Sequence, residues 1–192
     1  MKKTLLALTL FTGLVATSAN ASELSYSFVE VDYVNAGELD TGSDFDGYNV
    51  RGSVALGNSF YVLGNYSQTT ADFTGGINID LDTYSLGFGF HHGISDKADL
   101  FGDVSYEHGD ASTLGGSASD SGYRARFGFR GALNDKFEGT IGVTHFDLGN
   151  FSSDTSLLVG GQLKFNDTWG AAAEVEAGGD DTRYLVGIRA SF

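Results

Sequence analysis

Charged side chains recur at every second position along several short stretches of the chain. Arg124, Arg126 and Arg130 are separated by two or four residues, and Glu174 and Glu176 by two. A spacing of two places side chains on one face of a β-strand. Enclosed guanidinium and carboxylate groups form ion pairs, whereas the same groups along an open passage would make a charged pore. This face is predicted to carry fourteen charges: Glu30, Asp32, Arg51, Asp103, Glu107, Arg124, Arg126, Arg130, Glu138, Lys164, Glu174, Glu176, Arg183 and Arg189.

The histidines and the acidic loops do not have the spacing of a reactive site. His91 and His92 are adjacent, so a strand would point them to opposite faces. His108 and His145 lie at separate strand ends. The segment 44–47 (DFDG) matches only part of a calcium loop and lacks its first and last ligands. The chain also has no Cys. We therefore predict no catalytic, cofactor-binding or metal-binding residue, no cofactor and no enzymatic activity.

The elements that must position the charges are strands with one apolar face. In the last ten residues, Tyr184, Ile188 and Phe192 alternate with Arg183 and Arg189. A strand that crosses a bilayer at a tilt needs about 9–11 residues. Most other stretches show the same alternation, and together they predict an all-β protein whose strands have one lipid-facing and one polar face.

Short and long connections alternate along the chain, as in a transmembrane antiparallel up-and-down β-barrel with short periplasmic turns and longer acidic extracellular loops. The short turns are predicted at 57–59, 95–97, 134–136 and 166–168, and the long loops at 36–46, 70–80, 109–121, 148–153 and 178–181. Nine connections require ten strands, with eight as the alternative if the pair around 169–177 is miscounted. The predicted strands are 26–35, 47–56, 60–69, 82–92, 97–107, 122–133, 137–147, 155–165, 169–177 and 182–192.

The first predicted strand is the ambiguous one. Tyr26 and Phe28 fall on the face of Glu30 and Asp32, where the pattern expects polar residues. Either a β-bulge or an apolar plug near the periplasmic end would account for them.

Aromatic residues at the ends of the apolar faces distinguish a membrane barrel from a soluble β-sandwich or lipocalin-like barrel. Tyrosines mark the long-loop ends: Tyr33, Tyr48, Tyr66, Tyr84, Tyr106, Tyr123 and Tyr184. Phenylalanine and tryptophan mark the short-turn ends: Phe60, Phe90, Phe137, Phe165, Trp169 and Phe192. Two aromatic girdles are expected at two membrane interfaces, whereas a soluble core has no reason to sort aromatic residues in this way.

The N-terminus has the three parts of a secretory signal peptide. A basic start with Lys2 and Lys3 precedes a short apolar run, and Ala19-Asn20-Ala21 has the form of a cleavage site. We predict residues 1–21 as the signal peptide, cleaved after Ala21, and residues 22–192 as one barrel domain. Cleavage would remove two of the 11 basic residues and none of the 25 acidic ones, so nucleic acid is not an expected partner.

Three segments carry a resemblance to a known family: 28–34 (FVEVDYV), 163–170 (LKFNDTWG) and 184–192 (YLVGIRASF). The chain resembles small bacterial outer-membrane β-barrels, and among them the diffusible-signal-factor-regulated barrel family once proposed as secreted signals or elicitors. The resemblance implies a place in the cell outer membrane. It also implies that Tyr184, Ile188 and Phe192 form an assembly signal for the barrel assembly machinery, and it brings no catalytic residues.

Three functions agree with these patterns. The first is a structural or surface-interaction barrel whose lumen is filled by the charged network, which the narrow bore of ten strands favours. The second is a small low-conductance channel, and the third is a signal or elicitor released in outer-membrane vesicles. An outer-membrane protease would need longer loops to build a substrate cleft. The expected partners are outer-membrane lipid, lipopolysaccharide and the assembly machinery, and we expect a monomer.

Overall fold

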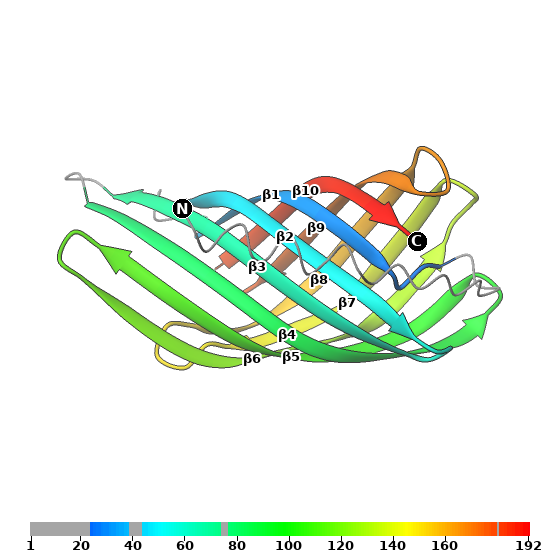
Figure 1. The fold of residues 1–192 in the computed structure, drawn as a ribbon, viewed down its shortest axis with the longest axis horizontal. Helices are drawn as coiled ribbons and strands as arrows, with labels where there is room; N and C mark the ends of the chain where they lie inside the picture. Colours follow the sequence, from blue (N-terminus) through cyan, green and yellow to red (C-terminus); the bar gives the residue numbers. More distant parts are fainter. Residues whose placement is uncertain (1–23, 39–43, 74–76, 180) are drawn as a thin grey trace.

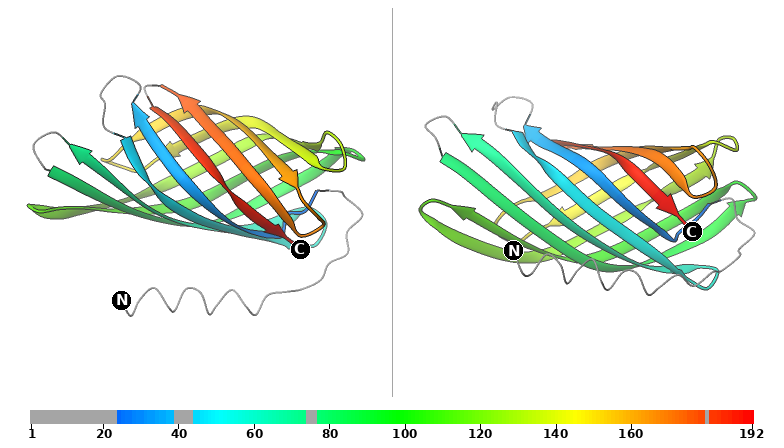
Figure 2. Two further views of the ribbon diagram at one scale, coloured as in Figure 1. Left: turned by 90° about the horizontal axis from the view of Figure 1, so that it is seen from above. Right: turned by 45° about the horizontal axis from the view of Figure 1, so that its top comes forward.

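A computed structural model describes residues 24–38, 44–73, 77–179 and 181–192. In these ranges ten antiparallel strands close into a single barrel, in which β1 pairs with β10 (Figures 1 and 2). The prediction of ten strands is confirmed, and the alternative of eight is wrong. The strands are β1 (Phe28–Glu38), β2 (Asp44–Leu56), β3 (Phe60–Phe73), β4 (Ile77–Ser95), β5 (Ala98–Thr113), β6 (Gly116–Ala132), β7 (Phe137–Asp147), β8 (Ser153–Lys164), β9 (Trp169–Gly178) and β10 (Asp181–Ser191).

Two predictions about the N-terminus, the signal peptide and its cleavage at Ala19 and Ala21, lie outside the described residues. Within the described part of the chain, no helix has the length and apolar character needed to span a membrane.

The four short turns lie at one end of the barrel, and two of them share one mechanism. Asn134 Oδ1 accepts hydrogen bonds from the amides of Lys136 and Phe137, at 2.9 and 3.0 Å. Asn166 Oδ1 accepts in the same way from the amides of Thr168 and Trp169. An Asn side chain that binds backbone amides two and three residues later closes a tight turn. In each turn the second of these amides belongs to the aromatic residue that begins the next strand.

The strands at the long-loop end run further than the sequence predicts. We predicted loops at 70–80 and 109–121, but β3 continues to Phe73, β4 begins at Ile77, and β5 and β6 leave only Leu114 and Gly115 between them. Asp, Gly and Ser are usual loop residues, yet pairing on both sides of β5 satisfies the backbone groups and outweighs that tendency. The ends of β4, β5 and β6 therefore project beyond those of β9 and β10 (Figure 1).

The outer face of the barrel is apolar and carries both aromatic girdles. At the long-loop end Tyr33 and Tyr106 are each 56% exposed, and at the short-turn end Phe165 and Phe192 are 58% and 62% exposed. Phe127 lies between the girdles and is 57% exposed. Such a continuous apolar exterior would be unfavourable in water and fits the hydrocarbon core of a membrane.

An apolar cluster fills the barrel near the short turns. It contains Leu24, Tyr26, Tyr61, Phe101 and Leu158, all at most 7% exposed. The pairing of β1 with both of its neighbours shows no register shift, so a bulge does not explain the apolar residues at its start. Of the two predicted explanations, the structure contains the apolar plug.

Candidate functional site in the barrel lumen

Strand alternation directs the predicted charges into the lumen. Each strand has its apolar set against the membrane, so the intervening residues point inward. Glu30, Asp103, Glu138 and Glu176 are all less than 9% exposed. Buried carboxylates require charged or hydrogen-bonding partners, and these partners come from neighbouring strands and from across the barrel.

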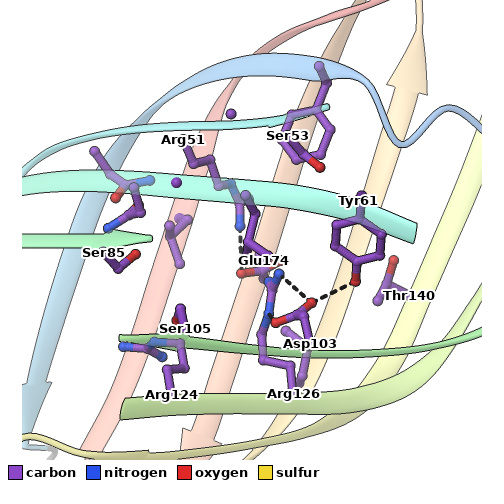
Figure 3. A pocket seen from close by; sticks show the side chains of 18 of the residues that line it. Arg51, Ser53, Tyr61, Ser85, Asp103, Ser105, Arg124, Arg126, Thr140 and Glu174 are labelled. Atoms are coloured by element: carbon purple, nitrogen blue, oxygen red, sulfur yellow. Dashed lines mark hydrogen bonds and ion pairs between the residues drawn. The ribbon is translucent and has the colours of Figure 1, made fainter. Parts of the chain in front are cut away.

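The largest group of ion pairs is centred on Glu30 and Arg51. Arg51 Nε donates to Glu30 Oε1 at 2.6 Å and lies 3.4 Å from Asp32 Oδ2. Across the lumen, Arg51 Nη1 donates to Glu174 Oε1 at 2.9 Å (Figure 3). Arg189 pairs with the second oxygen of Glu30. This group connects β1 and β2 to β9 and β10.

A second group joins β3, β5 and β6. Arg126 holds Asp103 with two hydrogen bonds, from Nε at 2.9 Å and from Nη2 at 3.0 Å. The Tyr61 hydroxyl donates to Asp103 Oδ2 at 2.8 Å (Figure 3). Two parallel bonds from a guanidinium to a carboxylate are among the strongest arrangements of this kind. Asp103 therefore accepts hydrogen bonds at both carboxylate oxygens.

A third group lies towards the long-loop end and is centred on Glu176. Arg124 Nη1 is 3.2 Å and Arg183 Nη1 is 3.5 Å from Glu176 Oε2, and the Thr144 hydroxyl donates to Oε1 at 3.0 Å. Arg124 Nε also lies 3.4 Å from Glu107 Oε1. One carboxylate thus pairs with two guanidinium groups from different strands.

A fourth group lies near the short turns. Arg130 Nε donates to Glu138 Oε2 at 3.1 Å, and Lys164 Nζ is 2.6 Å from Glu138 Oε1. Arg130 Nη1 also donates to the carbonyl oxygen of Ser25 at 2.7 Å. With this group included, each of the fourteen predicted lumen residues takes part in at least one ion pair.

A cavity of about 120 Å³ remains between the ion pairs. Its lining includes Arg51, Arg126 and Glu174, together with small or neutral groups such as Asn65 and Ser85. Among the described residues, the buried polar atoms without a hydrogen bond include Tyr26 Oη, Asn49 Oδ1 and Ser53 Oγ, and all three of these residues line the cavity. A polar cavity of this size with unsatisfied groups can hold a few water molecules.

The apolar plug carries a polar pair that sequence reasoning missed. The Tyr26 ring stacks on His91, with 3.9 Å between ring centroids and 15° between planes. His91 Nδ1 lies 3.0 Å from Asp99 Oδ2. The Arg130 guanidinium lies 5.1 Å from the Tyr26 ring centroid. Asp99 lies four residues before Asp103 on the same strand and so faces the same side. Alternation alone could therefore have identified Asp99 as an inward residue.

The other histidines stay apart. His92 is exposed on the face opposite to His91, as predicted from their adjacency. His145 Nε2 is 3.2 Å from the Tyr123 hydroxyl, and His108 Nδ1 is 2.6 Å from the Ser121 hydroxyl. In the described residues no group of three or more His, Cys, Asp or Glu side chains could hold a metal ion.

The three residues of the predicted assembly signal line the outer face of β10 and the C-terminus. Tyr184, Ile188 and Phe192 are 45%, 47% and 62% exposed, whereas Leu185 between them is buried in the interior. Phe192 donates its amide to the carbonyl of Ser27 at 2.9 Å. The three side chains are therefore on the membrane side, where another protein or lipid can contact them.

Asp120 anchors the turn between β7 and β8 at the long-loop end, beyond the tyrosine girdle. Its Oδ2 accepts hydrogen bonds from the backbone and side-chain nitrogens of Asn150, both at 2.7 Å. The Ser121 amide donates to Oδ1 at 2.8 Å. These hydrogen bonds stabilise the carboxylate and lower the pKa of Asp120, with the Asn150 backbone amide as the main cause.

The chain is similar in fold to solved barrels at low sequence identity. No protein-family model and no curated protein matches the chain. The translocator domain of the autotransporter NalP from Neisseria meningitidis is 13% identical, with 100% of this chain and 94% of that chain covered and a TM-score of 0.52. Neisserial surface protein A is 12% identical, with 88% and 98% covered and a TM-score of 0.50. The NanC porin is 8% identical, with 84% and 100% covered and a TM-score of 0.50.

These similarities concern the fold, which agrees with the physical features of the molecule. A closed barrel with an apolar exterior, an aromatic girdle at each end and a charged interior is the architecture of outer-membrane proteins. The chain therefore has the fold and the two-faced strands of outer-membrane β-barrels.

Proposed function

We propose that this protein is a closed outer-membrane barrel with a structural or surface-interaction role. The observation that carries the proposal is the filling of the lumen. The fourteen charged residues are paired, and Tyr26, Tyr61 and Phe101 block the end near the short turns. Paired charges offer an ion no path of one sign, and an apolar plug is a barrier to hydrated ions. The projecting ends of β4, β5 and β6 supply surface for contacts outside the cell.

Planar bilayer recording tests this proposal directly. The purified wild type should give no stable conductance, because both the network and the plug close the lumen. Tyr26→Ala removes the ring that stacks on His91 and should produce small openings, whereas Tyr106→Ala on the outer face should not. Stable nanosiemens conductance of the wild type, unchanged by Arg126→Ala, would refute the closed barrel.

A small channel is the second candidate, and the cavity of about 120 Å³ favours it. The cavity lies among both positive and negative groups, so a passage through it would be narrow and polar. One barrel with a similar fold, NanC, is described as a porin. For this chain, a channel would require displacement of the plug, which contains Tyr26, Tyr61 and Phe101.

We further propose a relationship with the diffusible-signal-factor-regulated barrels, on the strength of the three segments that resemble them. This relationship suggests the third candidate function, a signal or elicitor released in outer-membrane vesicles. A vesicle fraction from cells that lack the protein should then lose activity on the recipient cells or host tissue. A free N-terminal peptide should have no activity, because residues 28–38 form a barrel strand.

The partners that we propose follow from the location. Outer-membrane lipid and lipopolysaccharide would contact the apolar band and its girdles, and the assembly machinery would contact Tyr184, Ile188 and Phe192. We expect a monomer without nucleic-acid binding. We also infer that the protein is not an enzyme, since its buried His91–Asp99 pair lies beneath the Tyr26 ring in the plug.

A further inference from the structure

The hairpin of β5 and β6 continues past the strands beside it. Its pairing runs to Thr113 and Gly116, whereas the pairing of β6 with β7 ends at Tyr123 and Asp147. The β7–β8 turn reaches as far as Asp120. In the described structure no strand pairs with residues 116–119 on the side away from β5, and all four residues are exposed.

The backbone N–H and C=O groups of two residues point outward from this free edge, away from β5. The turn of the hairpin contains two residues, Leu114 and Gly115, so Thr113 and Gly116 form a hydrogen-bonded pair. In an antiparallel ladder such pairs alternate with pairs whose N–H and C=O groups point outward. Ser117 and Ser119 therefore offer donors and acceptors to a further strand.

The edge lacks the features that usually prevent strand addition. Natural edge strands are protected by Lys, by Pro, by a bulge or by a covering loop. Residues 116–119 read Gly-Ser-Ala-Ser, and their pairing with β5 shows no register shift. The side chains are small, so a partner strand could approach without a steric barrier.

The charges beside the edge are negative on the outer face. Asp110 is paired with Ser119, and its side chain is 57% exposed. On the next strand, Asp82 is paired with Asp110, and Asp80 with Ser112. These carboxylates would attract positive side chains on an added strand, since potentials at an interface are complementary.

We propose that the edge at Gly116–Ser119 is a docking site for an extended segment of a partner protein that carries basic side chains at alternate positions. The segment adds a strand to β6 by backbone hydrogen bonds and directs its basic side chains over Ser117 and Ser119 towards Asp110. This inference rests on the proposed surface-interaction role and names the class of partner.

The test uses the full chain folded in neutral detergent micelles and two labelled ten-residue peptides, one of alternating Lys and Thr and one of alternating Glu and Thr. Fluorescence anisotropy should show saturable binding of the Lys peptide alone. Hydrogen exchange at the amides of Ser117 and Ser119 should become slower in its presence. No binding of the Lys peptide at millimolar concentration, or equal binding of the Glu peptide, would overturn the proposal.

Two variants at one position separate edge pairing from general attraction to an acidic surface. Ser119→Pro removes an N–H that points away from β5, so the hairpin should persist and binding should weaken at least about tenfold. Ser119→Ala keeps the N–H and should bind like the wild type. Unchanged binding by Ser119→Pro would overturn the proposal. The bilayer recording is an independent test. A conducting barrel would refute the closed lumen, whereas a closed barrel that binds no peptide would refute only this inference.

Discussion

Among the described residues of the lumen, Asp103 depends on a single charged partner for its neutralisation. It is buried, and its ion pair in the described residues is with Arg126. We expect Arg126→Ala to lower the free energy of unfolding by about 3 kcal/mol, because the carboxylate stays buried without a counter-charge while the cavity admits some water. Urea titrations followed by Trp169 fluorescence measure this change.

The control for that change is the double variant Arg126→Ala/Asp103→Asn. It removes the uncompensated charge and keeps a hydrogen-bonding group for Tyr61. Most of the lost stability should return. A single variant as stable as the wild type would show that the pair is well hydrated.

Gly89 provides a second prediction, which depends on space alone. A Cβ at this position would lie 2.1 Å from Cζ of Tyr61. Gly89→Ala must displace the ring from the plug, and we expect a loss of about 1–3 kcal/mol in the free energy of unfolding. Gly64→Ala is the matched control, because its nearest neighbour, the Ser85 carbonyl oxygen, would lie at 3.5 Å. Equal effects of the two changes would mean that the ring moves freely.

A charge placed on the outer face of β6 tests whether this face contacts lipid or water. Phe127 lies between the girdles and is 57% exposed to the surroundings. Phe127→Arg should cost about 2–4 kcal/mol in lipid, the range for a charge near the bilayer midplane. Leu114→Arg is the control, because Leu114 is 97% exposed at the tip of the β5–β6 hairpin, beyond the girdle. Refolding into liposomes at increasing urea gives both values.

The outer face of the last strand supports a prediction about assembly. Replacing Tyr184, Ile188 and Phe192 together by Ser should leave unassembled chain in the periplasm. The matched control replaces Phe137, Ile141 and Val143 of β7, which are similarly exposed, and should reduce stability without blocking assembly. Fractionation of cells and heat-dependent mobility on gels report both. Normal surface levels of the first triple variant would contradict the assigned role.

The β7–β8 turn should respond to pH through Asp120. A lowered pKa means that the turn is stabilised above the usual Asp range, near pH 4, and loses this stabilisation only as the pH falls through the lower value in the folded protein. The NMR signal of the Asn150 side-chain amide should therefore stay constant from pH 7 to about pH 4 and shift below it. In Asp120→Asn the signal should not depend on pH over this range. A wild-type shift between pH 6 and 5 would be inconsistent with the hydrogen bonds described.

At the scale of the whole molecule, some features could be predicted from the sequence and others could not. Alternation and turn spacing are local properties, so they predict the ten strands, the girdles and the inward charges, as in β6 with Arg124, Arg126 and Arg130. Partners across the lumen, such as Arg51 and Glu174, depend on barrel shear, which the pattern does not contain. The stacking of Tyr26 on His91 joins the segment just before β1 to β4, and no local signal predicts it. The long β5–β6 hairpin was missed because its residues favour loops.

The hydrogen bond that joins Ser25, just before β1, to Phe192 has a consequence for the order of folding. The bond from Ser25 to Phe192 spans 167 residues, whereas Arg130 and Glu138 in one hairpin are 8 apart. Loop-closure entropy makes the first contact costlier by about 3 kcal/mol. Hairpins should therefore form early, and the seam between β1 and β10 should close last. Until then the nascent sheet has two unpaired borders, which only the meeting of the first and last strands removes.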